Sequence, residues 1–121
     1  MRKKCLDTYA LIEITKANPD FSIYLSQEII ITDITLAEFY AVLLHEDGKK
    51  TADYWFNKLS IYSVSVNKKT LKDAVAFRYQ HKKKRISFFD AVGYIFSIRQ
   101  GYLFVTGDKE FQQMKNVEFT K

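Results

Sequence analysis

Four acidic residues occupy positions where a solvated surface acid is not expected. Asp7, Glu38 and Asp90 are each the only charged residue within a stretch of at least eight residues, and Asp108 follows an apolar run. Because burial of an unpaired carboxylate costs several kcal/mol, an acid in an apolar segment normally has a partner that compensates its charge. We therefore treat these four side chains as candidates for a site that does chemistry.

The segments around these acids alternate between strand and helix patterns. Apolar and β-branched runs predict strands over residues 3–7, 28–32, 61–66 and 102–106, and a terminal edge strand over residues 117–120. Apolar residues predict helices over residues 9–17, 35–47, 68–82 and 87–99. Asn18-Pro19 marks the start of a short helix over residues 19–26, and further helices are expected over residues 49–59 and 108–114. Such alternation is typical of a mostly parallel sheet covered by helices on both faces. We predict one α/β domain over residues 1–121, a three-layer α/β/α sandwich around a sheet of four to five strands.

The predicted topology brings the four acids to one edge of the sheet. In an open parallel sheet, ligands bind outside the carboxyl ends of the strands, where the following helices begin. Asp7 and Asp108 lie at predicted strand ends, and Glu38 and Asp90 lie in the first turns of predicted helices. Converging carboxylates repel one another, and a hard divalent cation with oxygen ligands keeps them ionised together. We therefore expect a site for Mg²⁺ or Mn²⁺.

Helix capping is an alternative explanation for three of the acids. Thr35-Leu-Ala-Glu38 and Ser87-Phe-Phe-Asp90 match the spacing of a capping box, in which the acid satisfies a free backbone N–H. Asp7 can cap the helix that starts after it. Capping explains each of these acids taken alone, and only their conjunction favours a shared site.

Asp108 has a separate alternative. In the sequence Thr-Gly-Asp-Lys it fits an ordinary turn aspartate, whose side chain bonds to its own local backbone. Glu110 would then replace it as the fourth acid of the site. The sequence leaves this choice open.

The chain has the composition of a globular domain. Its 121 residues are 47% hydrophobic and 27% charged, and a domain of this length buries enough surface to fold without a disulfide. Cys5, the single cysteine, is expected to be a buried small hydrophobe in a reducing compartment. The most apolar stretch, residues 86–98, contains Asp90 and is shorter than the ~20 residues of a spanning helix. We expect no secretory signal and no membrane segment, and hence a cytoplasmic location.

The charge distribution points to an anionic partner only weakly. The formal net charge is +5, and setting four acids aside in a metal site leaves 19 basic against 10 acidic residues. That balance predicts a basic rim around an acidic pocket. The run Lys82, Lys83, Lys84 and Arg85, next to the helix of Asp90, is a candidate for holding phosphates by charge. A solvated loop is the alternative for this run.

The acids and their neighbours resemble a known set of motifs. Asp7-Thr8 follows an apolar strand, and the further segments are Thr35-Leu-Ala-Glu38, Phe89-Asp90-Ala91 and Val105-Thr106-Gly-Asp108. These segments resemble the acidic motifs of PIN-domain nucleases. Their order, their spacing and the total length are similar in particular to the single-domain VapC-type toxins of prokaryotic toxin–antitoxin pairs. The resemblance covers nearly the whole chain and implies a PIN-like α/β/α fold.

The resemblance implies a role for each motif residue. The catalytic, metal-binding carboxylates would be Asp7, Glu38, Asp90 and Asp108, with Thr8 and Thr106 as supporting residues. The reaction would be metal-dependent hydrolysis of RNA to a 5′-phosphate and a 3′-hydroxyl, with residues 82–85 holding RNA phosphates. The partners would be a small antitoxin protein, whose tail blocks the acidic pocket, and a second copy of the chain in a homodimer. The alternative is a catalytically inactive PIN-like module that binds RNA or protein.

Two positions depart from the PIN motifs. Tyr9 stands where the family usually has Asn or Ser, two residues after the first aspartate, and this alters how that turn is held. Gly107 stands between Thr106 and Asp108, where Arg or another polar residue is frequent, so a phosphate contact is missing there. Neither departure removes a carboxylate.

Other enzyme classes lack a residue that their chemistry needs. A haloacid-dehalogenase-like phosphatase has a second aspartate two residues after the first, and Tyr9 occupies that position here. A receiver domain has an acceptor aspartate at the end of its third strand, where this chain has Val66 and Asn67. A serine hydrolase of the nucleophile-elbow type needs Gly-x-Ser-x-Gly, which the sequence does not contain.

Overall fold

Five short strands form one parallel sheet in the computed structural model, which describes residues 2–121. The strands are β1 (Lys4–Leu6), β2 (Ile29–Thr32), β3 (Ser63–Val64), β4 (Leu103–Thr106) and β5 (Val117–Phe119). Their order across the sheet is β3-β2-β1-β4-β5, and every neighbouring pair runs parallel. All the carboxyl ends therefore lie at the same edge of the sheet, as predicted.

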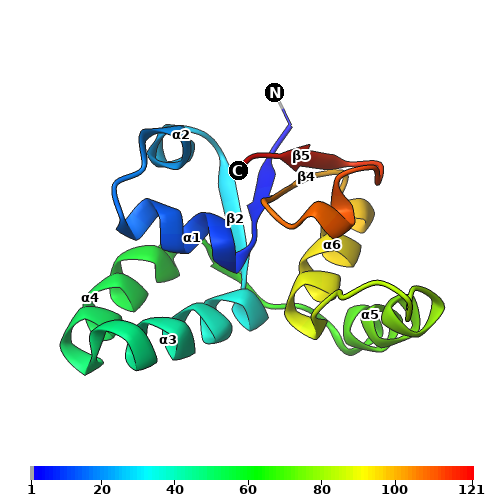
Figure 1. Cartoon of the computed structure of the whole chain (residues 1–121), viewed down its shortest axis with the longest axis horizontal. Coiled ribbons are helices and arrows are strands. Elements are labelled where there is room, and N and C mark those ends of the chain that lie inside the picture. Colours follow the sequence, from blue (N-terminus) through cyan, green and yellow to red (C-terminus); the bar gives the residue numbers. More distant parts are fainter. Residues whose placement is uncertain (1) are drawn as a thin grey trace.

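Helices cover both faces of this sheet. They are α1 (Thr8–Thr15), α2 (Pro19–Ser22), α3 (Asp33–Asp47), α4 (Lys49–Leu59), α5 (Lys68–Gln80) and α6 (Phe88–Gln100). Single turns of 3₁₀-helix follow at η1 (Ile23–Ser26), η2 (Ser60–Tyr62) and η3 (Lys109–Phe111). Figure 1 shows α1, α3 and α4 on one side of the sheet and α5 and α6 on the other, which confirms the three layers. Within residues 2–121, no helix has the length and apolar character needed to cross a membrane.

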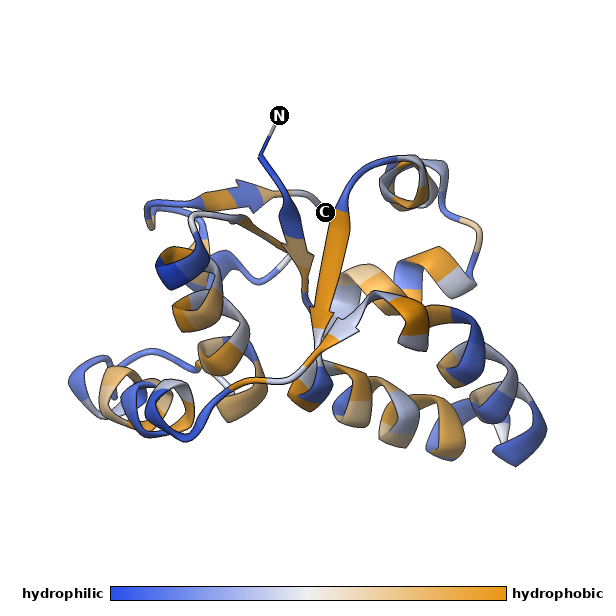
Figure 2. Cartoon of the chain, turned by 180° about the vertical axis from the view of Figure 1, so that it is seen from behind, coloured by the Kyte–Doolittle hydropathy of each residue, from blue (hydrophilic) through white to orange (hydrophobic). Residues whose placement is uncertain are grey.

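The sheet divides the hydrophobic core in two because successive side chains of a strand point to opposite faces. Ile29 and Ile31 of β2 belong to the core under α1, α3 and α4, and Ile30 belongs to the core under α5 and α6. All four residues of β2 are buried, and Figure 2 shows this strand as a continuous hydrophobic segment. Burial on both faces explains why β2 is a run of isoleucines rather than an alternating sequence.

Cys5 of β1 is part of this core, as predicted. It is fully buried, and burial raises the pKa of its thiol to about 12. The thiol is therefore protonated at neutral pH, and Cys5 packs as a small apolar side chain.

The third strand is shorter than predicted. The alternation over residues 61–66 predicts a longer strand, but only Ser63 and Val64 pair with β2. The preceding residues form η2, which closes when the N–H of Ser63 donates to the carbonyl of Ser60. Ile61 is 77% exposed, so the alternation there does not mark a buried face. The helix predicted over residues 108–114 is likewise reduced to the single turn η3.

Candidate active site

Asp7 lies directly after β1 with its side chain only 1% exposed. Its Oδ1 accepts a 2.8 Å hydrogen bond from the N–H of Ala10 and caps α1, so the capping explanation is confirmed for this residue. Its own N–H donates to the carbonyl of Val105 at 3.1 Å, and the hydroxyl of Thr106 bonds to its carboxylate. Asp7 is therefore fixed between the ends of β1 and β4.

Glu38 is not a capping residue, because α3 begins earlier than predicted. The hydroxyl of Thr32 caps the helix by accepting a 3.0 Å bond from the N–H of Thr35, and Asp33 is the first helical residue. Glu38 thus lies in the second turn of α3 rather than the first. Its carboxylate accepts a hydrogen bond from the hydroxyl of Thr8, the first residue of α1. The contact joins the first residue of α1 to the second turn of α3 near the carboxyl edge of the sheet.

Asp90 lies in the first turn of α6, as predicted. The hydroxyl of Ser87 caps the helix by accepting a 3.1 Å bond from the N–H of Asp90. Because α6 leads back to the amino end of β4, its own first turn starts at the carboxyl edge of the sheet. Ser87 is thus the cap, and the half-buried carboxylate of Asp90 faces the same space as Asp7.

Asp108 is both a turn aspartate and a neighbour of the other acids. Its Oδ1 accepts a 2.9 Å bond from the N–H of Glu110, and its N–H donates to the hydroxyl of Thr106 at 3.0 Å. The carboxylate of Glu110 is instead 3.8 Å from Nζ of Lys84. Asp108 lines the pocket described next, and Glu110 is not among the lining residues.

The four acids line one pocket of about 410 Å³ at the carboxyl edge of the sheet. The other lining residues are Thr8, Tyr9, Ser87, Gly107 and Lys121. The sequence predicts Ser87 only as a helix cap, although its position at a helix start three residues before Asp90 also indicates that it lies near the site. No sequence signal placed Lys121 here. We name this site the carboxylate pocket.

The basic run lies outside the carboxylate pocket. Lys82, Lys83, Lys84 and Arg85 are all exposed in the turn between α5 and α6. Nζ of Lys84 donates a 3.3 Å bond to the carbonyl of Glu110, on the segment that follows Asp108. The fold therefore sets these cations beside the carboxylates but not among them.

Burial and mutual repulsion raise the pKa of two of the acids. Burial is the main cause that raises the pKa of Asp7 to about 7, and the charges of Asp108 and Glu38 add to it. Burial likewise raises the pKa of Asp90 to about 8, with the charges of Asp7, Glu38 and Asp108 adding to it. The neighbouring acids thus act on Asp7 and Asp90, and a positive charge in the pocket would favour the ionised forms of these two carboxyl groups.

The donor set of this pocket suits a hard divalent cation. Carboxylate oxygens are the ligands that Mg²⁺ and Mn²⁺ prefer, and such an ion would offset the repulsion among the acids. Across residues 2–121, no three His, Cys, Asp or Glu side chains stand in the arrangement of a formed metal centre. The chemistry of the donors therefore fits such an ion, while the structure does not define which oxygens would contact it.

The two departures from the PIN motifs contact each other. A Cβ atom at position 107 would lie 2.6 Å from the ring of Tyr9 and 3.0 Å from the carbonyl oxygen of Thr120. The Tyr9 ring also packs edge-on against Phe21, with ring centroids 5.6 Å apart. Tyr9 thus fills the space that a side chain at position 107 would need, and only glycine fits beside it.

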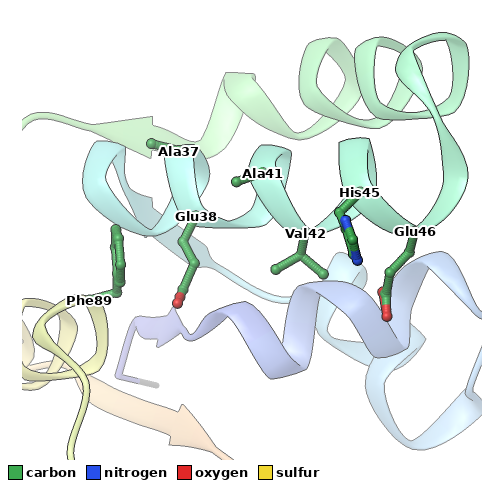
Figure 3. A pocket seen from close by; sticks show the side chains of 7 residues that line it. All are labelled: Ala37, Glu38, Ala41, Val42, His45, Glu46 and Phe89. Atoms are coloured by element: carbon green, nitrogen blue, oxygen red, sulfur yellow. The ribbon is translucent and has the colours of Figure 1, made fainter.

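A second cavity adjoins the carboxylate pocket through Glu38. It measures about 470 Å³ and is lined mainly by α3, together with Phe89 of α6. Figure 3 shows Glu38, Val42, His45 and Glu46 pointing from α3 toward α1. Glu38 is the only one of the four acids in its wall, so this cavity is a groove beside the site rather than part of it.

The fold is similar to those of solved toxin structures. VapC20 of Mycobacterium tuberculosis, a sarcin–ricin loop cleaving toxin, is 16% identical over 93% of this chain and 95% of its own, with a TM-score of 0.75. VapBC2 of Rickettsia felis, bound to promoter DNA, is 19% identical over 98% of this chain and 99% of its own, with a TM-score of 0.77. A toxin–antitoxin complex from Klebsiella pneumoniae is 16% identical over 95% of each chain, with a TM-score of 0.73. At these identities the similarity establishes the fold.

The sequence itself matches one family over most of its length. No curated protein matches the chain significantly. Residues 4–117 match the PIN domain, a span that contains all four acids of the carboxylate pocket. Proteins with this domain are typically nucleases. The chain therefore belongs to the PIN-domain family.

Proposed function

We propose that this protein is a divalent-metal-dependent endoribonuclease that hydrolyses RNA phosphodiester bonds. Its catalytic, metal-binding carboxylates are Asp7, Glu38, Asp90 and Asp108. The observation that carries the proposal is the convergence of these acids, from four separate segments, on one pocket. Burial and the charges of neighbouring acids raise the pKa of Asp7 and Asp90, and perturbed carboxyl groups in a pocket are a typical mark of a functional site. Membership in the PIN-domain family supports the same chemistry.

Two threonines orient these carboxylates. The hydroxyl of Thr106 bonds to the carboxylate of Asp7 and accepts from the N–H of Asp108, so it couples the acids that follow β1 and β4. The hydroxyl of Thr8 fixes the carboxylate of Glu38. When bound, Mg²⁺ or Mn²⁺ supplies the activation of water and offsets negative charge on the phosphate. Thr8 and Thr106 are thus positioning residues in the proposed site.

The basic turn after α5 supports binding of a polyanion. Its exposed cations, Lys82, Lys83, Lys84 and Arg85, hold RNA phosphates outside the carboxylate pocket by charge. Because none of them lines the pocket, their contribution is to the affinity for RNA rather than to bond cleavage.

We further propose that the nuclease is the toxin of a toxin–antitoxin pair and forms a homodimer. Solved structures of similar fold include toxin–antitoxin complexes, in which the toxin is held by a protein partner. The groove along α3 opens beside Glu38, so a partner chain seated there would cover one side of the carboxylate pocket. Expression of the chain in a bacterial host is expected to arrest growth, whereas an Asp90→Asn variant is expected to be tolerated. Light scattering of the purified protein gives its oligomeric state.

The direct test is cleavage of a mixed RNA pool by the purified protein with Mg²⁺, with Mn²⁺ and with a chelator. We expect cutting that depends on metal and disappears in Asp90→Asn. Asp47→Asn is the matched control, because Asp47 is an exposed acid at the far end of α3. Products with 5′-phosphates would agree with metal-assisted hydrolysis.

An inactive PIN-like module gives a different result in the same assays. It would bind RNA but show no metal-dependent cutting, and its RNA affinity would survive replacement of Asp7 and Asp90 by Asn. Cleavage that persists in the chelator or in Asp90→Asn would contradict the proposed nuclease.

A further inference from the structure

The positive charge of the chain is concentrated in one segment. Residues 68–85, which form α5 and the turn after it, contain eight of the 19 Lys and Arg residues but one of the 14 Asp and Glu residues. The segment therefore carries a net charge of +7, and the rest of the chain carries −2. The excess of basic residues is thus not spread evenly around the carboxylate pocket. We name this segment the basic α5 surface.

The basic α5 surface contains a shallow hollow with an aromatic wall. The hollow has a volume of about 320 Å³ and is lined by Val75, Arg78, Tyr79, Lys82, Lys84 and Ile86. Tyr79 is 72% exposed, although it belongs to α5, a helix that packs against α6. The Nζ atom of Lys82 lies 5.0 Å from the centroid of this ring. The hollow thus combines an accessible aromatic ring with several cations.

One wall of the hollow is held in place by a hydrogen bond from a side chain to the backbone. Nε of Arg78 donates a 2.8 Å hydrogen bond to the carbonyl of Ile86, which ties the end of α5 to the chain that leads into α6. Ile86 is 4% exposed and anchors this connection in the core. The hollow is therefore a formed feature of the fold rather than a loose group of lysines.

The hollow lies next to the carboxylate pocket along two routes. Ile86 in its wall is followed directly by Ser87, which lines the pocket. Lys84 in its wall also bonds to the carbonyl of Glu110, two residues beyond Asp108. The wall of the hollow is therefore joined to the wall of the carboxylate pocket by consecutive residues and by the contact of Lys84.

We propose that the hollow binds one unstacked nucleotide of single-stranded RNA, outside the carboxylate pocket. The ring of Tyr79 stacks against the base, and Lys82 and Lys84 contact the flanking phosphates. Exposed aromatic rings between cations are the means by which proteins hold single strands with little sequence preference. The inference rests on the proposed ribonuclease, because it assigns the hollow to the RNA that enters the carboxylate pocket.

The same observations favour RNA over other occupants. A second copy of the chain would bring another segment of net charge +7 against this one if it bound by the same surface, and like charges repel. The carboxylates of an acidic peptide would pair with the lysines but would make no favourable contact with the exposed ring beside them. A nucleotide matches both parts of the hollow.

The test measures binding without cleavage. A labelled single-stranded RNA of about 12 nucleotides is titrated with the full chain in a chelator, and fluorescence anisotropy gives the Kd. We expect Tyr79→Leu to weaken binding about fivefold or more, and Tyr79→Phe to stay within about twofold of the wild type. Tyr54→Leu is the matched control, since Tyr54 is 57% exposed on α4 with Nζ of Lys58 5.8 Å from its ring centroid.

The charge contacts are tested by the salt dependence of the same Kd. The double variant Lys82→Gln/Lys84→Gln is expected to lower the slope of log Kd against log salt by about 1.4, the value for two phosphates of a single strand. The double variant Lys50→Gln/Lys58→Gln on α4 should leave the slope unchanged, because both residues are exposed away from the hollow.

Each outcome decides the proposal. Equal RNA affinity for Tyr79→Leu and the wild type, or equal losses for Tyr79→Leu and Tyr54→Leu, would overturn it. A change of oligomeric state in Tyr79→Leu with unchanged RNA affinity would assign the surface to protein contacts instead. Metal-dependent cleavage of RNA by the wild type is measured in a separate assay, so the two proposals can fail independently. If RNA binding depends on Tyr79 but no RNA is cut, the nucleotide site in the hollow is supported and the proposed nuclease is contradicted. If RNA is cut but binding does not depend on Tyr79, the nuclease is supported and the nucleotide site is contradicted.

Discussion

The carboxylate pocket and the basic α5 surface adjoin each other but are built in different ways. Asp7 of the pocket is 1% exposed and held by the backbone N–H of Ala10 and a threonine hydroxyl, whereas Tyr79 of the α5 surface is 72% exposed. The acids come from four separate segments, and the cations come from one helix and the turn after it. Fixed geometry is what bond cleavage requires, and dense exposed charge is what attraction of a polyanion requires.

The difference also appears in how each region affects stability. Burial and repulsion raise the pKa of Asp7 and Asp90, so the pocket in its ionised form lowers the stability of the folded protein. Exposed lysines are solvated, and neutralising one of them has little effect on folding. Substitutions in the pocket should therefore change rate and stability together, and substitutions on the α5 surface should change only affinity.

The largest expected effect separates Asp108 from its neighbour Glu110. Asp108→Asn should lower the cleavage rate more than about 100-fold, beyond the loss expected for a residue that only supports a ligand. The amide oxygen of Asn can still accept the N–H of Glu110, so the turn is retained. Glu110→Gln should stay within about threefold of the wild type, because it removes only a partly exposed ion pair with Lys84. A larger loss in Glu110→Gln than in Asp108→Asn would show that the pocket has been assigned the wrong acid.

The pH dependence of cleavage is the second prediction. In the metal-free protein the pKa of Asp7 is about 7 and that of Asp90 about 8, so protons compete with the cation below these values. At limiting Mg²⁺ the rate should rise from about pH 6 to about pH 8, by up to about tenfold per pH unit for each proton displaced. Saturating Mg²⁺ should move the rise to lower pH. A rate at limiting Mg²⁺ that is constant across this range would contradict the coupling of these acids to the metal.

A smaller effect is expected from the threonine that couples two of the acids. Thr106 is fully buried, and Thr106→Val keeps its volume while removing the bonds to Asp7 and Asp108. Metal affinity should fall about tenfold, the lower end for a residue that orients a ligand. Thr106→Ser should restore it, because the hydroxyl is kept. Isothermal titration with Mn²⁺ measures both variants, and equal affinities for Thr106→Val and the wild type would remove the positioning role.

The order of the elements and the positions of the acids could be read from the sequence. Parallel strands end at one edge, so locating the strand ends was enough to place Asp7 and Asp108, and a helix start was enough to place Asp90. Glu38 lines the same pocket, although it lies in the second turn of α3 and not in the first turn that the sequence predicts. Thr32 and not Thr35 caps α3, a difference of one turn that hydrophobic spacing does not resolve.

Features that depend on contacts between distant segments could not be read in this way. Tyr9 and Gly107 were each visible as departures from the PIN motifs, but their contact arises only when α1 and the end of β4 meet. The exposure of Tyr79 could not be predicted from the sequence either, because an aromatic residue on a helix is usually part of the core. The pocket could be predicted from topology, whereas the hollow required the packing of side chains.

The stability of the metal-free protein should change on substitution in the carboxylate pocket and should hardly change on substitution of exposed lysines. Asp90 has a folded pKa of about 8 against the ordinary value of 3.8 for aspartate, so the folded state binds the proton more tightly. Stability contributed by this group is therefore present at about pH 4 and lost as the pH rises toward about 8. Asp90→Asn removes that loss and should raise the Tm in chelator at about pH 8 by about 3 °C or more. Thermal unfolding of Asp90→Asn and the wild type at both pH values, with Asp47→Asn as control, measures this change. A lower Tm for Asp90→Asn than for the wild type at about pH 8 would contradict the raised pKa of Asp90.

The smallest expected effect belongs to a cation that touches neither the hollow nor the pocket. Lys83 is exposed in the turn after α5 and does not line the hollow beside Tyr79. Lys83→Gln should weaken RNA binding about twofold and lower the salt slope by about 0.7, equally for RNAs of different sequence. Single-turnover cleavage of bound RNA should be unchanged, because the carboxylates keep their geometry. A slower single-turnover rate in Lys83→Gln would mean that the basic turn also positions the scissile phosphate, and the separation between the two regions would not hold.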